Sequence, residues 1–193
     1  MSDMSRLLRK TIPLPIFLLL AGIGATVGAQ GRMTIQATAT GTSTQLGRIY
    51  EVHIYIEQLS TPDDQQRLID AFSRSRQDGL VDALHDMKSK GRVRFSSGGV
   101  GNEVKYIIEL PSEEGRRFRL VTDRNIAFAE QHQGARSEGY SVGVIELILT
   151  PDGKGSGTLM PACKLTLDKK TKQIENESYQ NPWKLTNLVV THD

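Results

Sequence analysis

The stretch Tyr50-Glu51-Val52-His53-Ile54-Tyr55-Ile56-Glu57 alternates between apolar side chains at its even-numbered positions and more polar ones at its odd-numbered positions. A period of two is typical of a β-strand that buries one face and exposes the other. We therefore expect a strand over Gly47–Leu59, whose polar face carries Glu51, His53, Tyr55 and Glu57. Carboxylates beside an imidazole can bind a metal or transfer a proton, but the alternation favours an ordinary solvent-facing strand.

The segment after this strand has the signals of a helix start. Thr61 can cap a helix, Pro62 suits its first turn, and Asp63-Asp64 favours the positive end of the helix dipole. Apolar residues then recur at helical spacing before and after Asp78-Gly79, namely Leu68, Ile69, Phe72, Leu80, Val81, Leu84 and Met87. The pattern predicts a helical hairpin that is interrupted at Asp78-Gly79 and ends at Lys90-Gly91.

The period of two returns after the helical region and continues to the end of the chain. Together with Met33–Thr40, it predicts strands over Arg92–Ser96, Glu103–Leu110, Arg117–Thr122, Val142–Thr150, Gly157–Leu167, Gln173–Tyr179 and Lys184–Thr191. Short turns join several of these strands, and such strands pair antiparallel because parallel pairing needs long crossovers. We expect an α+β fold, mainly an antiparallel sheet that is curled or partly closed into a barrel, with the helical hairpin inserted after the first strands.

The first 29 residues have the composition of an export signal. Arg6, Arg9 and Lys10 precede an uncharged, largely apolar stretch that ends in the small residues Val27-Gly28-Ala29. We expect cleavage after Ala29, which leaves a single domain over residues 30–193 and no stable membrane anchor. The predicted location is periplasmic or extracellular.

Removal of this leader changes the charge of the chain. The leader holds three of the 24 basic and one of the 22 acidic residues, so 21 of each remain. A neutral protein has no long-range field that attracts phosphates, which argues against nucleic acid as a partner. The single cysteine excludes an internal disulfide framework and a Cys-rich zinc site, and we expect no metal and no cofactor.

Gly139-Tyr140-Ser141-Val142-Gly143 matches the G-x-S-x-G pattern of hydrolases that use a serine nucleophile. Asp152 or Asp168, followed by His192, would complete a catalytic set in the usual chain order. However, a polar loop precedes this serine and a strand-like apolar run follows it, whereas the hydrolase motif connects a strand to a helix. The residues favour a protein that is not an enzyme, with serine hydrolysis at Ser141 as an alternative.

Glu146 lies in a strand that is apolar on both faces, which is typical of an internal strand. A buried carboxylate needs a cation or a proton, and Arg117, Arg119 and Arg124 are candidate partners. Two interpretations remain open: a structural ion pair, or a polar anchor inside a ligand cavity. The polar stretch over Glu130–Ser141 is expected to be a loop. Its part Gly134–Tyr140 and the turn-forming residues Thr122–Asn125 are expected to form a pocket rim, which makes Asp123, Arg124, Glu130, Tyr140 and Glu146 candidate ligand-binding residues.

Several short blocks are similar to a group of uncharacterised exported bacterial proteins. They are Thr122–Glu130, Arg136-Ser137, Tyr140, Ile145-Glu146 and Gly153-Lys154-Gly155. The resemblance implies a bacterial cell-envelope setting and no particular activity.

These observations favour a non-enzymatic envelope or secreted protein that binds a small apolar ligand inside a β-sheet cavity. The alternative is a protein-docking module that binds an envelope partner through exposed strand edges.

Overall fold

The computed structural model describes residues 32–126, 140–152, 154–168 and 170–192. The predicted leader and Glu130 lie outside the described residues, as does most of the predicted loop over Glu130–Ser141.

The elements of the described residues follow the order predicted from the sequence. They are β1 (Met33–Gly41), the short 3-10 helix η1 (Ser43–Gln45), β2 (Ile49–Ile56), α1 (Pro62–Asp86), β3 (Gly91–Phe95), β4 (Asn102–Leu110), β5 (Arg116–Thr122), β6 (Val142–Leu149), β7 (Gly155–Leu167), β8 (Ile174–Gln180) and β9 (Trp183–His192). No helix among the described residues is long and apolar enough to cross a membrane.

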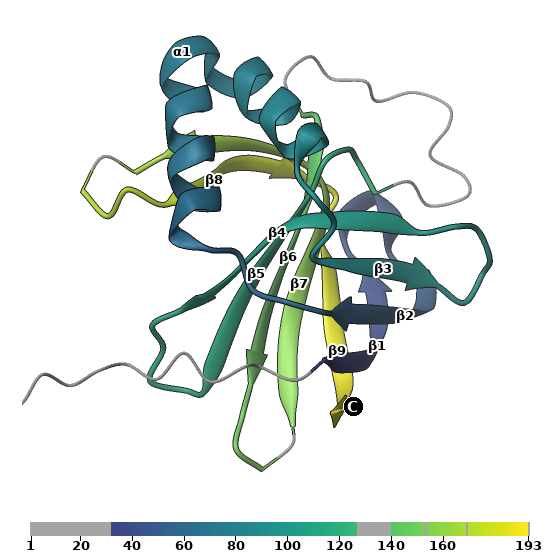
Figure 1. Cartoon of the computed structure of the whole chain (residues 1–193). Coiled ribbons are helices and arrows are strands. Elements are labelled where there is room, and N and C mark those ends of the chain that lie inside the picture. The colour runs from purple at the N-terminus through teal and green to yellow at the C-terminus, as the bar shows by residue number, and fades with distance from the viewer. Residues whose placement is uncertain (1–31, 127–139, 153, 169, 193) are drawn as a thin grey trace, which may run out of the picture.

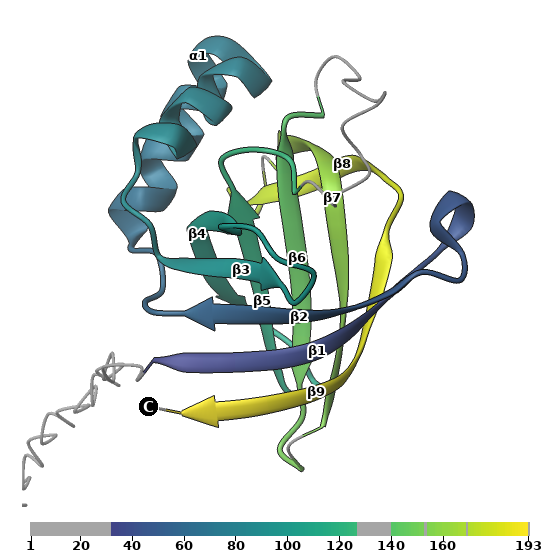
Figure 2. The same cartoon turned by 90° about the vertical axis from the view of Figure 1, so that its right-hand side faces the viewer.

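Eight of the strands form a closed antiparallel barrel (Figures 1 and 2). Their order is β6-β5-β4-β3-β2-β1-β9-β7, and the pairing of β7 with β6 closes the ring. The mainly antiparallel sheet is therefore confirmed, but the curled or partly closed form expected from the sequence is corrected to a closed barrel. Closure depends on β1 and β9, which come from opposite ends of the described chain and pair along most of their length.

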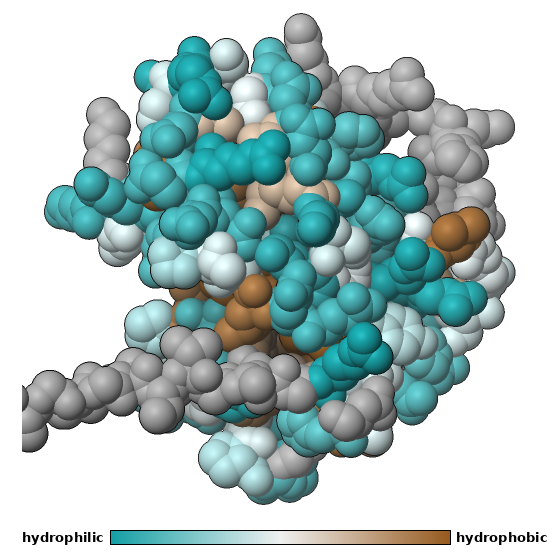
Figure 3. All heavy atoms as spheres, in the orientation of Figure 1, coloured by the Kyte–Doolittle hydropathy of each residue, from teal (hydrophilic) through white to brown (hydrophobic). Residues whose placement is uncertain are grey.

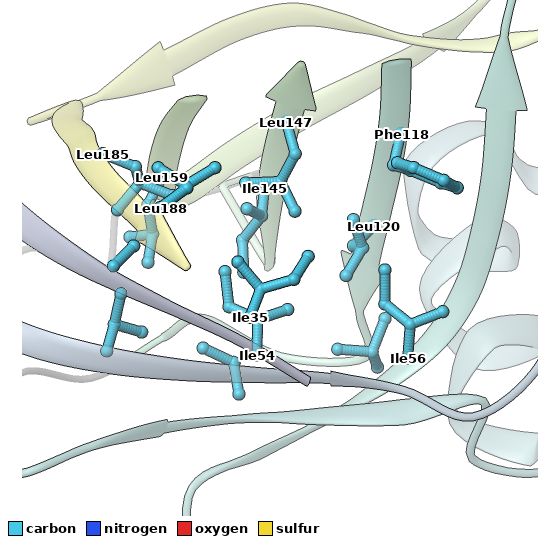
Figure 4. Packing of buried hydrophobic residues seen from close by; sticks show 14 of the residues in the cluster. Ile35, Ile54, Ile56, Phe118, Leu120, Ile145, Leu147, Leu159, Leu185 and Leu188 are labelled. Atoms are coloured by element: carbon cyan, nitrogen blue, oxygen red, sulfur yellow. The ribbon is translucent and has the colours of Figure 1, made fainter. Parts of the chain in front are cut away.

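The interior of the barrel is filled by hydrophobic side chains from its strands (Figure 4). Alternation turns Ile35 on β1, Ile54 on β2, and Leu120 and Ile145 on β5 and β6 inward, and all four are fully buried. Trp183 joins this interior and contacts Tyr50, with ring centroids 5.5 Å apart. The barrel is thus a packed core within the described residues.

The expected helical hairpin is one helix, α1, with a sharp bend. Thr61 caps it as predicted: its hydroxyl accepts a hydrogen bond from the Asp64 N–H, and the Asp64 carboxylate accepts one from the Thr61 N–H. The bend lies at Ser75 and Arg76, where Arg76 has a φ of 51°, and not at Asp78-Gly79. The glycine has another role, because a Cβ atom there would lie 2.5 Å from the Ala71 carbonyl oxygen.

A second hydrophobic core lies outside the barrel, between its wall and α1. Helix residues such as Leu68, Leu80 and Leu84 pack there against the outward-facing Tyr106 and Val144. The far part of β7 passes from β9 to β8: residues 162–167 pair with β8 instead of β9, while Cys163 still pairs with Val142 of β6. We call residues 162–167 together with β8 the arm, which helps α1 to cover the outer face of the barrel (Figure 1).

Candidate functional site

An ion-pair cluster lies on the outer face of the barrel wall. Alternation that buries Phe118 inside the barrel turns Arg117 and Arg119 outward on β5, and Glu146 is directly opposite Arg119 on β6. Arg119 Nη2 and Nε lie 2.7 and 2.9 Å from Glu146 Oε1, and Arg117 Nη2 lies 2.8 Å from Glu146 Oε2. The expected partial burial and ion pairing of Glu146 are therefore present with two of its three candidate partners.

The same cluster connects the barrel wall to the arm. Arg119 is only 7% exposed, and its Nη1 donates a hydrogen bond of 2.8 Å to the carbonyl oxygen of Ile174 on β8. Burial by itself raises the pKa of Glu146, but the hydrogen bonds and positive charges of Arg117 and Arg119 outweigh it and leave that pKa lowered. Glu146 therefore stays ionised at neutral pH.

A hollow of about 400 Å³ opens beside this cluster, between the wall and the arm. Its lining residues are Leu110, Pro111, Arg117, Arg119, Glu146, Gln173, Glu175 and Asn176. Asn176 Oδ1 is buried and has no hydrogen-bond partner among the described residues, while Arg117 keeps 38% of its side chain exposed. The hollow thus offers a partly exposed guanidinium on the wall.

The arm also presents the edge of a sheet. The Asp168 N–H donates to the Gln173 carbonyl, so the main-chain groups of Gln173 point toward β7. Along an antiparallel strand these groups alternate between the two sides, so those of Ile174 and Asn176 point away from β7. The bond from Arg119 to the Ile174 carbonyl agrees with this direction. We call these outward groups the outer edge of β8. In the described part of the chain no strand pairs with it, because β8 is the last strand of the sheet.

The other candidate ligand-binding residues do not join Glu146. The Ser178 hydroxyl donates a hydrogen bond of 3.1 Å to the Tyr140 hydroxyl, on another part of β8. Asp123 Oδ2 lies 3.4 Å from His85 Nδ1, and the Arg124 guanidinium reaches the Gly101 carbonyl at 3.4 Å. The described candidates therefore fall into three separate places.

The residues expected to assist Ser141 are placed elsewhere. Asp152 accepts from Thr150 and Lys154 in the turn at the far end of β6, and Asp168 accepts from Lys170 and Thr171 in its own turn. His192 is paired with Met33 at the end of β9, and Figure 2 shows that end of the chain far from the start of β6. Ser141 immediately precedes a strand, so the strand-to-helix turn of the hydrolase motif is not formed here.

The polar face of β2 forms a small hydrogen-bonded group. The Ser96 hydroxyl lies 3.0 Å from Glu51 Oε2 and 3.4 Å from His53 Nε2, and Glu51 Oε1 lies 3.3 Å from the same His53 nitrogen. In a catalytic triad the carboxylate binds the imidazole nitrogen that faces away from the hydroxyl. This group is therefore not arranged as a triad, and the described residues contain no cluster of three or more His, Cys, Asp or Glu that could hold a metal.

The surface is poor in apolar features on the face that carries α1 and the arm. Figure 3 shows this face as mostly hydrophilic, with separate hydrophobic spots. Tyr179, on the arm, is one of the large hydrophobic side chains that are exposed, at 51%. Single exposed apolar residues do not make a hydrophobic docking patch.

Sequence reasoning missed the contribution of Ile174 and Asn176, because their importance comes from the main chain. The ion pairing of Glu146 could be predicted from the sequence, because Arg117 and Arg119 alternate with Phe118 and so share one face of their strand. No family model matches the chain, and neither a curated protein nor a solved structure is significantly similar to it.

Proposed function

We propose that this protein is an exported, non-enzymatic docking protein, and that it binds an extended segment of an envelope partner at the outer edge of β8. The observation that carries the proposal is the position of β8 outside the closed ring, with β7 as its one partner strand in the described sheet. Unpaired main-chain groups at a sheet edge bind an added strand through the hydrogen bonds of an ordinary sheet.

The packed interior directs this choice between the two binding modes expected from the sequence. A small apolar ligand inside the barrel would have to displace buried side chains such as Leu120 and Ile145. Well-packed cores resist such rearrangement, since the insertion of a few extra methylene groups already destabilises a protein by about 1–3 kcal/mol. The outer edge of β8 needs no rearrangement of the core.

The charges of β8 favour a partner that is not a second copy of this chain. Glu175 and Glu177 both lie on the strand, and Glu177 is 3.5 Å from Lys164 on β7. Two copies of β8 paired edge to edge would bring these carboxylates together, and like charges on paired strands are destabilising. A partner segment with Lys or Arg side chains is therefore favoured.

The docking proposal is tested with peptides selected against residues 30–193 from a random library of about six residues, the usual strand length. Asn176→Pro removes the outward N–H, whereas the matched control Asn176→Ala removes the same side chain and keeps that N–H. We expect Asn176→Pro to weaken peptide binding about tenfold more than Asn176→Ala, because a lost hydrogen bond at a buried interface costs about 1–3 kcal/mol. Equal affinities for the two variants would contradict strand addition at β8.

Export is tested separately by expressing the full chain in a bacterial host and measuring the intact mass of the product. We expect a protein outside the cytoplasm that begins at Gln30. β1 begins at Met33, so this cleavage leaves every described strand in place. Recovery of the chain in the cytoplasm with Met1 still attached would contradict export.

A further inference from the structure

We propose that the segment docked on β8 ends in a free α-carboxylate, and that the guanidinium of Arg117 binds this carboxylate. The inference rests on the proposed docking function and specifies its partner: a protein whose extended carboxyl terminus is the bound segment.

Arg119 limits how far an added strand can pair along β8. Its Nη1 occupies the outward carbonyl of Ile174, and its other nitrogens are held by Glu146. Because Arg119 is buried and Glu146 holds its other nitrogens, displacing Nη1 from the Ile174 carbonyl would leave a buried N–H of a charged group without its acceptor, which is costly. An added strand can therefore pair with β8 no farther than Asn176, next to the irregularity that shifts the register of β8 against β7 between Asn176 and Ser178.

The direction of the added strand follows from the pairing in the rest of the sheet. Every strand pair recorded in the described sheet is antiparallel. β8 runs from Ile174 to Gln180, so an added antiparallel strand runs in the opposite sense. Its carboxyl end then arrives at Asn176, beside the hollow.

The residues that meet this end of the added strand include a cation. Arg117 lines the hollow with Asn176 and bonds Glu146 through Nη2, while its Nε and Nη1 have no hydrogen-bond partner among the described residues. A guanidinium binds a carboxylate well because two parallel N–H groups can reach both oxygens. Leu110 and Pro111 provide an apolar wall for the final side chain of the docked segment.

The charge count agrees with an anion at Arg117. Glu146 is shared by two arginines, so the three side chains carry one net positive charge. Glu175 lines the hollow from the side of the arm and carries the opposite charge. This arrangement favours a segment with a basic residue near an anionic end.

The test compares each selected peptide as a free acid and as a carboxyl-terminal amide, in binding to the wild type, Arg117→Gln and the control Arg116→Gln. Arg116 is the neighbouring arginine on β5 and pairs with Glu109, at 2.9 Å, outside the hollow. We expect the acid to bind the wild type and Arg116→Gln about tenfold more tightly than the amide, the size typical of a hydrogen bond to a charged group. In Arg117→Gln the ratio should fall to about one, and Arg117→Lys, which keeps the charge without the paired N–H groups, should lie between.

The outcomes separate this inference from the proposed function. Equal binding of acid and amide to the wild type, with Asn176→Pro still weakening both, overturns the carboxylate inference and leaves docking at β8 in place. A preference for the acid that persists in Arg117→Gln also overturns it, because the carboxylate is then bound elsewhere. If Asn176→Pro has no effect beyond Asn176→Ala for any peptide, both proposals fall.

Discussion

Arg119 on β5 and Glu146 on β6 lie directly opposite each other outside the barrel, and the guanidinium of Arg119 also donates to the Ile174 carbonyl on the arm. One buried side chain therefore joins the barrel wall to β8. It fixes the position of the outer edge of β8 relative to the hollow.

Glu146→Gln should destabilise the fold, because it leaves the buried Arg119 charge without its counterion. We expect the free energy of unfolding to fall by about 3 kcal/mol, the size typical of removing one partner of a buried pair. Urea unfolding followed by the fluorescence of Trp183, the one tryptophan of the chain, measures this change. The control Glu109→Gln breaks a more exposed pair with Arg116 and should cost less than about 1 kcal/mol; equal losses would show that Glu146 is not a structural anchor.

Acid should weaken the fold partly through Asp64. Burial raises the pKa of Asp64, but hydrogen bonds from Lys90 and from Thr61 outweigh it, and the pKa is lowered. The unfolded chain then binds a proton at higher pH than the folded chain, so this contribution to stability is present above the unfolded pKa, about 3.9, and is lost as the pH falls through the folded value. When unfolding is measured from pH 7 downward, the free energy of unfolding should fall less steeply below about pH 5 in Asp64→Asn than in the wild type. If the free energy of unfolding depends on pH in the same way in both proteins, Asp64 does not make this contribution.

The thiol of Cys163 should be unreactive in the folded protein. Burial in the second core raises the pKa of Cys163 to about 12, so the reactive thiolate is scarce at neutral pH. A thiol reagent added at pH 8 should label the native chain far more slowly than the chain in denaturant. Rapid labelling of the native protein would show that the arm and α1 do not cover this residue.

Arg76→Gly should stabilise the bend of α1. Arg76 has φ 51° and ψ −132°, a conformation that side chains rarely adopt and that glycine adopts readily. The free energy of unfolding should rise by about 1 kcal/mol from the relief of this backbone strain. The loss of the contact between the Arg76 guanidinium and the Phe72 ring, at 5.6 Å, reduces this gain. Thermal unfolding compares this variant with Arg74→Gly, which lies in regular helix and should be destabilised. A lower melting temperature for Arg76→Gly than for the wild type would contradict this explanation of the bend.

The sequence predicted the strands well because each strand with one buried face carries its own local signal. The alternation in Gly47–Leu59 and Arg117–Thr122 identified β2 and β5, and the capping residues Thr61 and Asp64 identified the start of α1. Closure of the barrel could not be predicted in this way, because alternation shows which side chains are buried and not which strands are neighbours. The pairing of β1 with β9 is such a long-range relationship.

The candidate site was predicted in part for the same reason. Burial of Glu146 and its pairing with arginines follow from a carboxylate in an apolar strand and two cations on one face of the preceding strand. The bend of α1 at Arg76 has no such signal, and Asp78-Gly79 was the wrong place for it because glycine can be required for close packing as well as for a break. The outer edge of β8 is made of main-chain groups, which every sequence possesses.

Amide hydrogen exchange along β8, with and without a selected peptide, tests docking at this edge most directly. Asn176 N–H points outward and should exchange at least about tenfold more slowly in the complex, since a new sheet hydrogen bond protects it, whereas the inward Glu175 N–H should change little. Unchanged exchange at Asn176, together with new protection in strands that line the barrel interior, would contradict docking at β8 and favour a ligand inside the barrel.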